Sequence, residues 1–259
     1  HSHYHLVSAD PSNPPFDEPT FDGGYELGAL GVALPRDAIN DFRDEARDGG
    51  IYARGAQQVI LGRLDDRGRP MHGYVSYRRN SRRPWTDVQI SATNGIMFVN
   101  GHVELLGGRL DGRLTIATNA TMDIENDVVY RDSDANGPKQ YCDDMLGLVA
   151  SSHIRVAYNA ANRRDCVIHA HMISVGNSFK VQNHSSGRPR GTLTVHGGIC
   201  QKSRGAVGTG YLWGDRLVIR SGYTKDYNYD RRLAFGAPPG YELFLLTGRY
   251  RRLAWREVS

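Results

Sequence analysis

Apolar and polar residues alternate with a period of two through most of residues 94–130. The stretch contains four short runs, at 96–99, 102–106, 113–118 and 122–130, and Gly and Asn residues separate them. Such alternation is typical of β-strands, whereas an amphipathic helix repeats every three or four residues. Very short strands with minimal corners suit a chain that winds in coils, each strand pairing with the coils on either side. The pattern therefore predicts an all-β protein, with a β-solenoid as the first hypothesis.

Similar runs continue on both sides of this stretch. They lie at 51–53, 58–61 and 71–77 before it, and at 146–151, 153–158, 165–175, 178–183, 191–201, 210–214 and 216–223 after it. Residues 65–68 predict a hairpin turn, and residues 131–144 predict a loop that interrupts the strands. Runs that recur about every eight to twelve residues indicate a right-handed β-solenoid whose coils of roughly 20 to 30 residues have three faces. A β-sandwich would also give alternating strands and is the structural alternative.

One segment, residues 36–47, follows a helical pattern instead. It places Ala38, Ile39, Phe42 and Ala46 on a single face, and Gly49-Gly50 would end the helix. Acidic residues near its start suit the positive end of the helix dipole. We expect this helix to cover the open end of the first coil, because an uncovered end exposes unpaired backbone and apolar core.

These patterns divide the chain into three parts. Residues 1–50 comprise an extended Pro-, Asp- and Ser-rich stretch, a short strand-like run at 25–34 and the capping helix. Residues 51–234 form the body of the solenoid. We expect residues 235–259 to fold back and pack along that body.

The charge of the chain argues against nucleic-acid binding. The net charge is +4, from 32 basic and 28 acidic residues, and only four of the basic residues are lysine. The arginines occur in pairs that are scattered among carboxylates, whereas a nucleic-acid site gathers them on one face with stacking aromatic side chains. An acidic glycan or the acidic face of a partner is the favoured use of local clusters such as residues 77–83. No apolar run is long enough to span a membrane.

Three cysteines, Cys142, Cys166 and Cys200, match no zinc or redox motif. Cys166 and Cys200 both lie in strand-like runs, so one disulfide could join them across neighbouring coils and leave Cys142 free. The alternative, three buried thiols, is equally compatible with the sequence. No cofactor is expected.

The densest group of aromatic and charged residues lies near the C-terminus. Tyrosines beside guanidinium groups could stack on sugars or anchor a neighbouring subunit; the alternative is a segment that packs along the flank of the solenoid, with its aspartate paired to an arginine. These candidates for partner or glycan contacts are Tyr223, Tyr227, Tyr229, Asp230, Arg231 and Arg232.

Metal-binding and catalytic candidates are weaker. If His1 is a processed N-terminus, its amine together with His3 could chelate Cu(II). His169 and His171 share a strand face but lack a visible third ligand. Two acidic sets, Asp143-Asp144 and the alternating trio Asp123, Glu125 and Asp127, are the ones that a polysaccharide-active enzyme could use. For the trio, solvent exposure of an outer strand face is the simpler explanation, so we assign no catalytic residue.

Several segments together resemble an uncharacterised bacterial β-solenoid family whose members often carry a PilX-like, type IV prepilin-style N-terminus. The matching segments are FDGGYELGALGVALP (21–35), GRLDGRLTIATNATMDIENDVVY (108–130), DDMLGLVASSHIRV (143–156), HGGICQKSRGAVG (196–208), GYTKDYNYDRRL (222–233) and APPGY (237–241). The chain lacks the hydrophobic prepilin-like helix of that family, which leaves proteolytic maturation, a shortened chain or export without an anchor as explanations.

The resemblance implies an extracytoplasmic structural protein with no established catalytic residues. We therefore expect an extracellular or cell-surface protein that associates with itself in a filament or surface layer, or with other surface or pilus proteins. The alternative is a β-solenoid enzyme or binding module for acidic polysaccharide.

Overall fold

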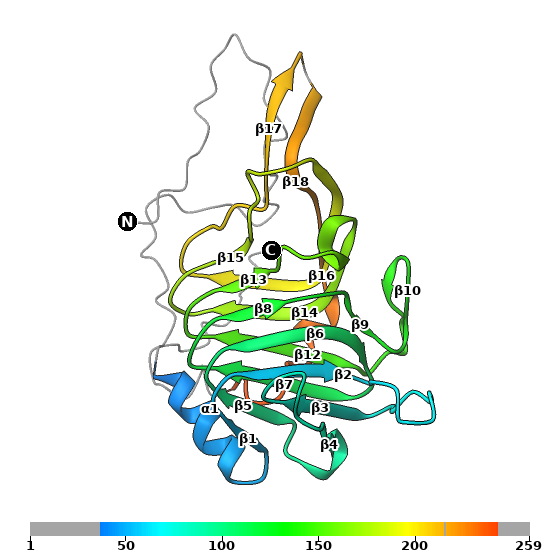
Figure 1. Cartoon of the computed structure of the whole chain (residues 1–259), viewed down its shortest axis with the longest axis vertical. Coiled ribbons are helices and arrows are strands. Elements are labelled where there is room, and N and C mark those ends of the chain that lie inside the picture. Colours follow the sequence, from blue (N-terminus) through cyan, green and yellow to red (C-terminus); the bar gives the residue numbers. More distant parts are fainter. Residues whose placement is uncertain (1–36, 215, 243–259) are drawn as a thin grey trace, which may run out of the picture. The chain divides into compact units, whose positions relative to one another are not determined.

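The computed structural model describes residues 37–214 and 216–242. This part of the chain is mostly β-structure with a single α-helix, so the predicted all-β class is confirmed (Figure 1). The strand-like run expected at 25–34 and the last part of the C-terminal segment, residues 243–259, lie outside the described residues.

The helix and strands follow the alternation of the sequence closely. The four runs of the 94–130 stretch become five strands, because the last run is broken in two at Glu125–Asp127. The elements are α1 (Ala38–Arg47), β1 (Ile51–Arg54), β2 (Gln57–Leu61), β3 (Tyr74–Arg78), β4 (Thr86–Gln89), β5 (Ile96–Asn100), β6 (Val103–Leu110), β7 (Arg113–Thr118), β8 (Met122–Ile124), β9 (Val128–Tyr130), β10 (Ser133–Asp134), β11 (Gly137–Pro138), β12 (Met145–Ala150), β13 (Ile154–Val156), β14 (Cys166–Ser174), β15 (Phe179–Val181), β16 (Pro189–Gln201), β17 (Gly208–Trp213) and β18 (Arg216–Tyr229).

Two parallel ladders organise the described strands. The first ladder runs in the order β1, β5, β7, β12, β14, β16, β18. The second runs β2, β6, β8, β13, β15, and β9 links β6 of the second to β14 of the first. Among the described strands, antiparallel pairing is limited to β2–β3, β3–β4, β10–β11 and β17–β18. A β-sandwich consists of antiparallel sheets, so this pairing does not fit that alternative.

The inward side chains of the two ladders meet in one apolar core. Alternate residues of each strand, such as Met97 and Val99 of β5 and Val103 and Leu105 of β6, are fully buried in it. Side chains of a strand point alternately to its two faces, so each strand contributes every second residue. The two-residue period of the sequence therefore corresponds to the side chains that enter this core.

The first ladder is buried on its outer face as well. The apolar face of α1, which the sequence predicted correctly, packs there against Ile96 and Phe98 of β5 and Ala117 of β7. Helix α1 thus lies over the outer face of the first strands, and its expected role as cover for the end of the coil stays a prediction. Because β5 is buried on its outer face as well as on its inner face, its sequence is a continuous apolar run rather than a strict alternation.

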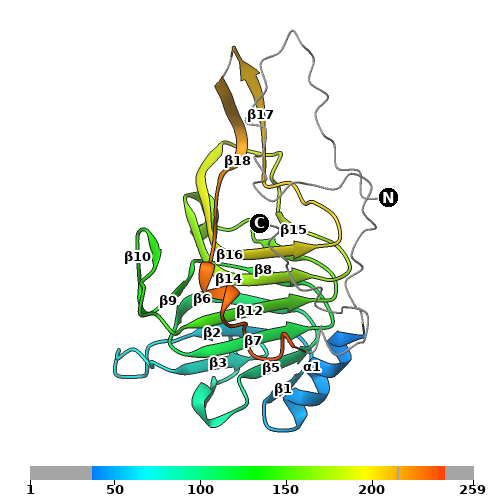
Figure 2. The same cartoon turned by 180° about the vertical axis from the view of Figure 1, so that it is seen from behind.

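The segment after β18 crosses the outer face of the same ladder (Figure 2). Arg113 Nη2 donates to the carbonyl of Ala237 at 2.6 Å, and Thr115 Oγ1 donates to the carbonyl of Pro239 at 2.6 Å. The hydroxyl of the buried Tyr241 donates to the carbonyl of His171 at 2.7 Å. These bonds attach the chain up to residue 242 to the outer face of the ladder. Within the described residues, no helix has the length and apolar character that a bilayer crossing demands.

Candidate functional site

Strand β18 is the last strand of the first ladder, and it carries the tyrosines that the sequence singled out. Residues 224–229, which we call the β18 end, pair on one side with β16 in parallel register. No described strand pairs with their other side, because β17 pairs only with the earlier part of β18. An unpaired strand edge offers N–H and C=O groups to another strand. The β18 end is therefore a candidate contact surface.

Some side chains of the β18 end are in register with core side chains of β16. Lys225 and Tyr227 lie opposite Leu193 and Val195 of β16, both of which are buried in the core. Tyr227 nevertheless remains 42% exposed, and Tyr229 is 66% exposed. The covered Val195 of β16 is thus followed by the partly uncovered Tyr227, and the covered Leu193 by the exposed Lys225. Tyr227 and Lys225 are the side chains that a further strand would bury.

Partial burial also shifts the ionisation of these side chains. Burial raises the pKa of Tyr227 to about 12, so its hydroxyl stays protonated at neutral pH. Burial lowers the pKa of Lys225, and the nearby Arg204 lowers it further. Tyr227 thus presents a neutral phenol hydroxyl near the Lys225 cation, and tyrosine is a side chain favoured at protein interfaces.

The first half of β18 forms a ribbon with β17 that projects beyond the stacked strands (Figures 1 and 2). Tyr211 and Val218 are cross-strand partners on this ribbon, and both are exposed. Leu212 and Trp213 are also exposed, Trp213 to 74%. Apolar groups gathered on one exposed element commonly mark a contact with another molecule. The ribbon extends the aromatic surface of the β18 end.

The other residues of the predicted cluster hold the chain together internally. Tyr223 is buried, and its hydroxyl donates to the carbonyl of Asn162 at 2.5 Å. Arg232 binds the carboxylate of Asp230 through Nη2 at 2.7 Å and donates from Nη1 to the carbonyl of Cys142 at 2.6 Å. The aspartate–arginine pair that the sequence analysis kept as the structural alternative is thus present. Tyr227, Tyr229 and the exposed Arg231 remain as surface residues.

The paired histidines of β14 lie in buried surroundings. His169 Nδ1 accepts from the backbone N–H of Tyr130 at 3.2 Å, and the ring of His171 packs on the ring of Tyr241 at 5.0 Å between centroids. Burial lowers the pKa of each of these histidines to about 4. Within the described part, no three His, Cys, Asp or Glu side chains gather as metal ligands; His1 and His3 lie outside it.

The acidic candidates are used as structural acceptors, each in a different place. Asp144 is buried and accepts from the backbone N–H of Gly112 at 2.6 Å. Asp127 accepts from the N–H of Val167, and Glu125 accepts from Asn159. Asp123 is 6% exposed and ion-paired, so simple solvent exposure, the explanation favoured from the sequence, is wrong for this residue.

The disulfide considered between Cys166 and Cys200 is also wrong. All three cysteines are free thiols, with Cys166 opposite Leu193 and Cys200 opposite Ile173. At about 3.3 Å per residue along a strand, this register separates the two cysteines by roughly 20 Å, whereas a disulfide needs their Cα atoms within about 7 Å. Membership of neighbouring strands was predicted correctly, but the register was not.

We compared the chain with known proteins in three ways. No protein-family model, no curated protein and no solved structure matches it.

Two features of the candidate surface were missed by reasoning from the sequence. The ribbon with Tyr211 and Trp213 was expected only as two strands, and the strand expected at 216–223 was not extended to Tyr229, although Tyr227 and Tyr229 were contact candidates. A signal was present, because Tyr223, Tyr227 and Tyr229 occupy odd positions and so continue the period of two beyond residue 223. The charged residues between them concealed the strand.

Proposed function

We propose that this protein is an extracellular structural protein that associates with itself through the β18 end, as a subunit of a filament or surface layer or as an accessory of pili. One observation carries the proposal: the last strand of the first ladder has an unpaired edge among the described residues and exposed tyrosines, of which Tyr227 is in register with a core residue of β16. A second copy would cover both features at once.

We further propose that the two ladders are faces of a right-handed β-solenoid. The supporting observation is the order of the strands: β5 and β6, β7 and β8, β12 and β13, and β14 and β15 alternate between the first and second ladder. Each passage of the chain therefore adds one strand to both ladders. In such a fold every coil is held by its neighbours, and stability grows with the number of coils. This arrangement suits a load-bearing protein.

The ends of the first ladder indicate how copies would join. Among the described strands, β1 pairs only with β5, at the opposite end of the ladder from β18. Addition of the β18 end of one copy to the β1 edge of the next would continue the parallel ladder by β-augmentation. Because the two contact surfaces differ, such an interface is heterologous and generates an open filament unless the rotation closes a ring.

The extracellular location and the pilus association rest on the resemblance of six sequence segments to the solenoid family described above. Labelling of intact host cells with a membrane-impermeant reagent tests the location. We expect the protein to be labelled; complete protection from the reagent until the cells are broken would refute an extracellular site.

Sedimentation velocity of the full chain over a hundredfold dilution tests self-association. We expect assemblies at high concentration that dissociate on dilution. Tyr229→Lys should weaken them at least tenfold, because it places a charge within the proposed contact. Tyr141→Lys is the matched control, since Tyr141 is 69% exposed on the loop after β11, outside both ladders.

Two results would overturn the proposal. One is a chain that stays monomeric at every concentration. The other is an assembly that Tyr229→Lys and Tyr141→Lys leave equally intact, since the contact would then lie elsewhere.

A further inference from the structure

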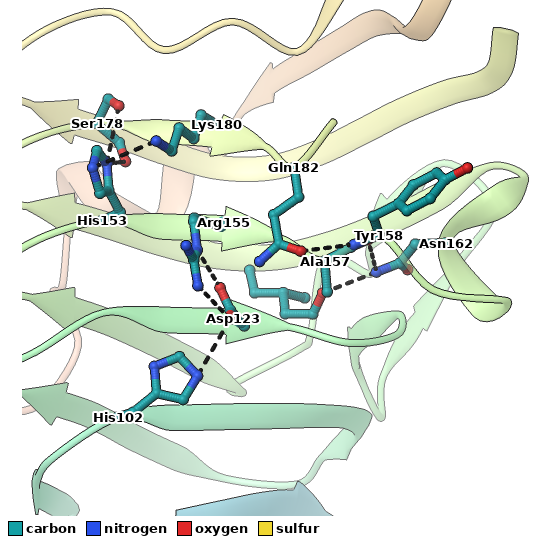
Figure 3. Close-up of polar contacts among 11 residues, drawn as sticks. His102, Asp123, His153, Arg155, Ala157, Tyr158, Asn162, Ser178, Lys180 and Gln182 are labelled. Carbon is teal, nitrogen blue, oxygen red and sulfur yellow. Dashed lines mark hydrogen bonds and ion pairs between the residues drawn. The ribbon is translucent and has the colours of Figure 1, made fainter. Parts of the chain in front are cut away.

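The outer face of the second ladder carries a row of ionisable side chains in register. Glu104 of β6, Asp123 of β8, Arg155 of β13 and Lys180 of β15 occupy neighbouring positions on successive strands. Successive strands lie about 4.8 Å apart, so each side chain is one strand spacing from the next. Figure 3 shows Asp123, Arg155 and Lys180 in this row, with their histidine neighbours. We call these four residues the charged row.

The acidic half of the charged row is fully engaged. Arg155 donates from Nε to Asp123 Oδ1 at 2.6 Å and from Nη2 to Oδ2 at 2.7 Å, and His102 Nε2 lies 3.2 Å from the same Oδ2. Glu104 accepts from Gln58 Nε2 at 2.9 Å. Bidentate arginine–carboxylate pairs are among the stronger polar contacts in proteins. Asp123 therefore fixes the orientation of the Arg155 guanidinium.

In the basic half, Arg155 is paired with Asp123, but Lys180 is not matched. Lys180 lies near the imidazole of His153, with 3.5 Å between Nζ and Nε2, and among the described residues no carboxylate lies within ion-pair distance of it. His153 Nδ1 faces the carbonyl of Ser178 at 3.4 Å, so the neutral tautomer donates there and leaves Nε2 to accept from Lys180. Burial lowers the pKa of His153, and Lys180 lowers it further, which keeps the ring neutral. Lys180 thus carries an uncompensated positive charge.

Groups that suit a sugar flank these two cations. Tyr158 follows β13 and is 43% exposed, with the guanidinium of Arg190 packed 4.6 Å from its ring centroid. The backbone N–H of Tyr158 donates to Gln182 Oε1 at 3.1 Å, which orients the Gln182 amide beside Lys180 on the same strand face (Figure 3). Aromatic rings, amides and cations held in fixed positions are the elements of a small polar binding site.

We propose that Arg155 and Lys180, with Tyr158 and Gln182, bind a carboxylate-bearing saccharide of an acidic polysaccharide. Arg155 commits Nε and Nη2 to Asp123, which leaves Nη1 for the ligand. One carboxylate is held by Nη1 of Arg155 and Nζ of Lys180, two residues that are paired on neighbouring strands, while the sugar ring lies toward Tyr158 and its hydroxyls meet the Gln182 amide. The site does not depend on the self-association proposed above.

Isothermal titration of the full chain with oligogalacturonate tests this site. We expect binding that weakens as salt is raised and no binding of neutral cello-oligosaccharide. Lys180→Gln should weaken binding at least tenfold. Lys139→Gln is the control, because Lys139 is also half-buried but lies on the turn after β11. Urea unfolding of both variants verifies that each is folded.

Four outcomes would overturn the assignment. They are no binding of oligogalacturonate at millimolar concentration, equal affinity for the neutral oligosaccharide, equal loss in the Lys180→Gln and Lys139→Gln variants, and preferential binding of a heparin fragment or a DNA oligonucleotide. The last result would point to sulfate or phosphate in place of a carboxylate.

Discussion

The ion pair at the centre of the charged row makes a quantitative prediction about stability. The carboxylate of Asp123 is nearly buried and accepts two hydrogen bonds from Arg155, with His102 as its second partner. Replacement by alanine would leave the Arg155 charge without its counter-ion next to Lys180. Loss of a fully buried pair costs about 3 to 5 kcal/mol, and a hydrogen bond to a charged group contributes roughly 1.5 to 3 kcal/mol.

Water reaches the partners of Asp123, which reduces the expected effect. The side chains of Arg155 and His102 are 29% and 34% exposed. We therefore expect Asp123→Ala to lower the free energy of unfolding by about 2 kcal/mol, below the range for a fully buried pair. Urea unfolding at neutral pH, followed by circular dichroism, measures this difference directly.

A second, more exposed ion pair with a single hydrogen bond provides the comparison. Arg131 Nη1 binds Asp111 at 2.8 Å, but these side chains are 47% and 29% exposed. We expect Asp111→Ala to cost no more than about 0.5 kcal/mol, as is usual for a surface pair. Equal losses in the free energy of unfolding for the two substitutions would refute the reasoning, because burial would then not strengthen the contribution of the Asp123 pair to stability.

Two further predictions concern acid and backbone packing. Because the folded pKa of His169 and His171 is about 4, below the unfolded value near 6.5, the free energy of unfolding should fall as the pH is lowered from about 6.5 to about 4. His169→Asn should flatten this part of the pH profile in urea unfolding, and an unchanged slope would count against the assignment. Gly108 and Gly112 have nearly the same positive φ, +112° and +111°, but a Cβ at Gly108 would collide with the carbonyl oxygen of Leu61, whereas a Cβ at Gly112 meets open space. Gly108→Ala should therefore cost at least about 2 kcal/mol more than Gly112→Ala in the same assay, and equal costs would contradict the close approach of β2 to β6.

Local patterns in the sequence were sufficient for the helix and for most strands, but they missed β4, the short β10 and β11, and the last part of β18. The alternation through residues 94–130 marks the side chains that enter the core, and the helical face from Ala38 to Ala46 is buried as expected. Both features depend only on the two-residue period of a strand and the 3.6-residue period of a helix. These periods can be read within one segment, without knowing which other segment it packs against.

Pairing and register lie beyond such patterns. Cys166 and Cys200 were placed correctly in strands, yet nothing in either run indicates that seven residues of β16 separate Cys200 from the partner of Cys166. The burial of Asp123 was missed for the same reason. Its partner Arg155 lies on the next strand of the ladder, and only the register brings the two together.

Amide hydrogen exchange at residues 224–229, measured at low and high protein concentration, tests the central claim most directly. If copies join through the unpaired edge of β18, the exchange of these amides should slow as the concentration rises, because new strand pairing protects them. The loop after β11, which contains Tyr141, should exchange at the same rate at both concentrations. Exchange at residues 224–229 that does not change with concentration, in samples that contain assemblies, would contradict the account.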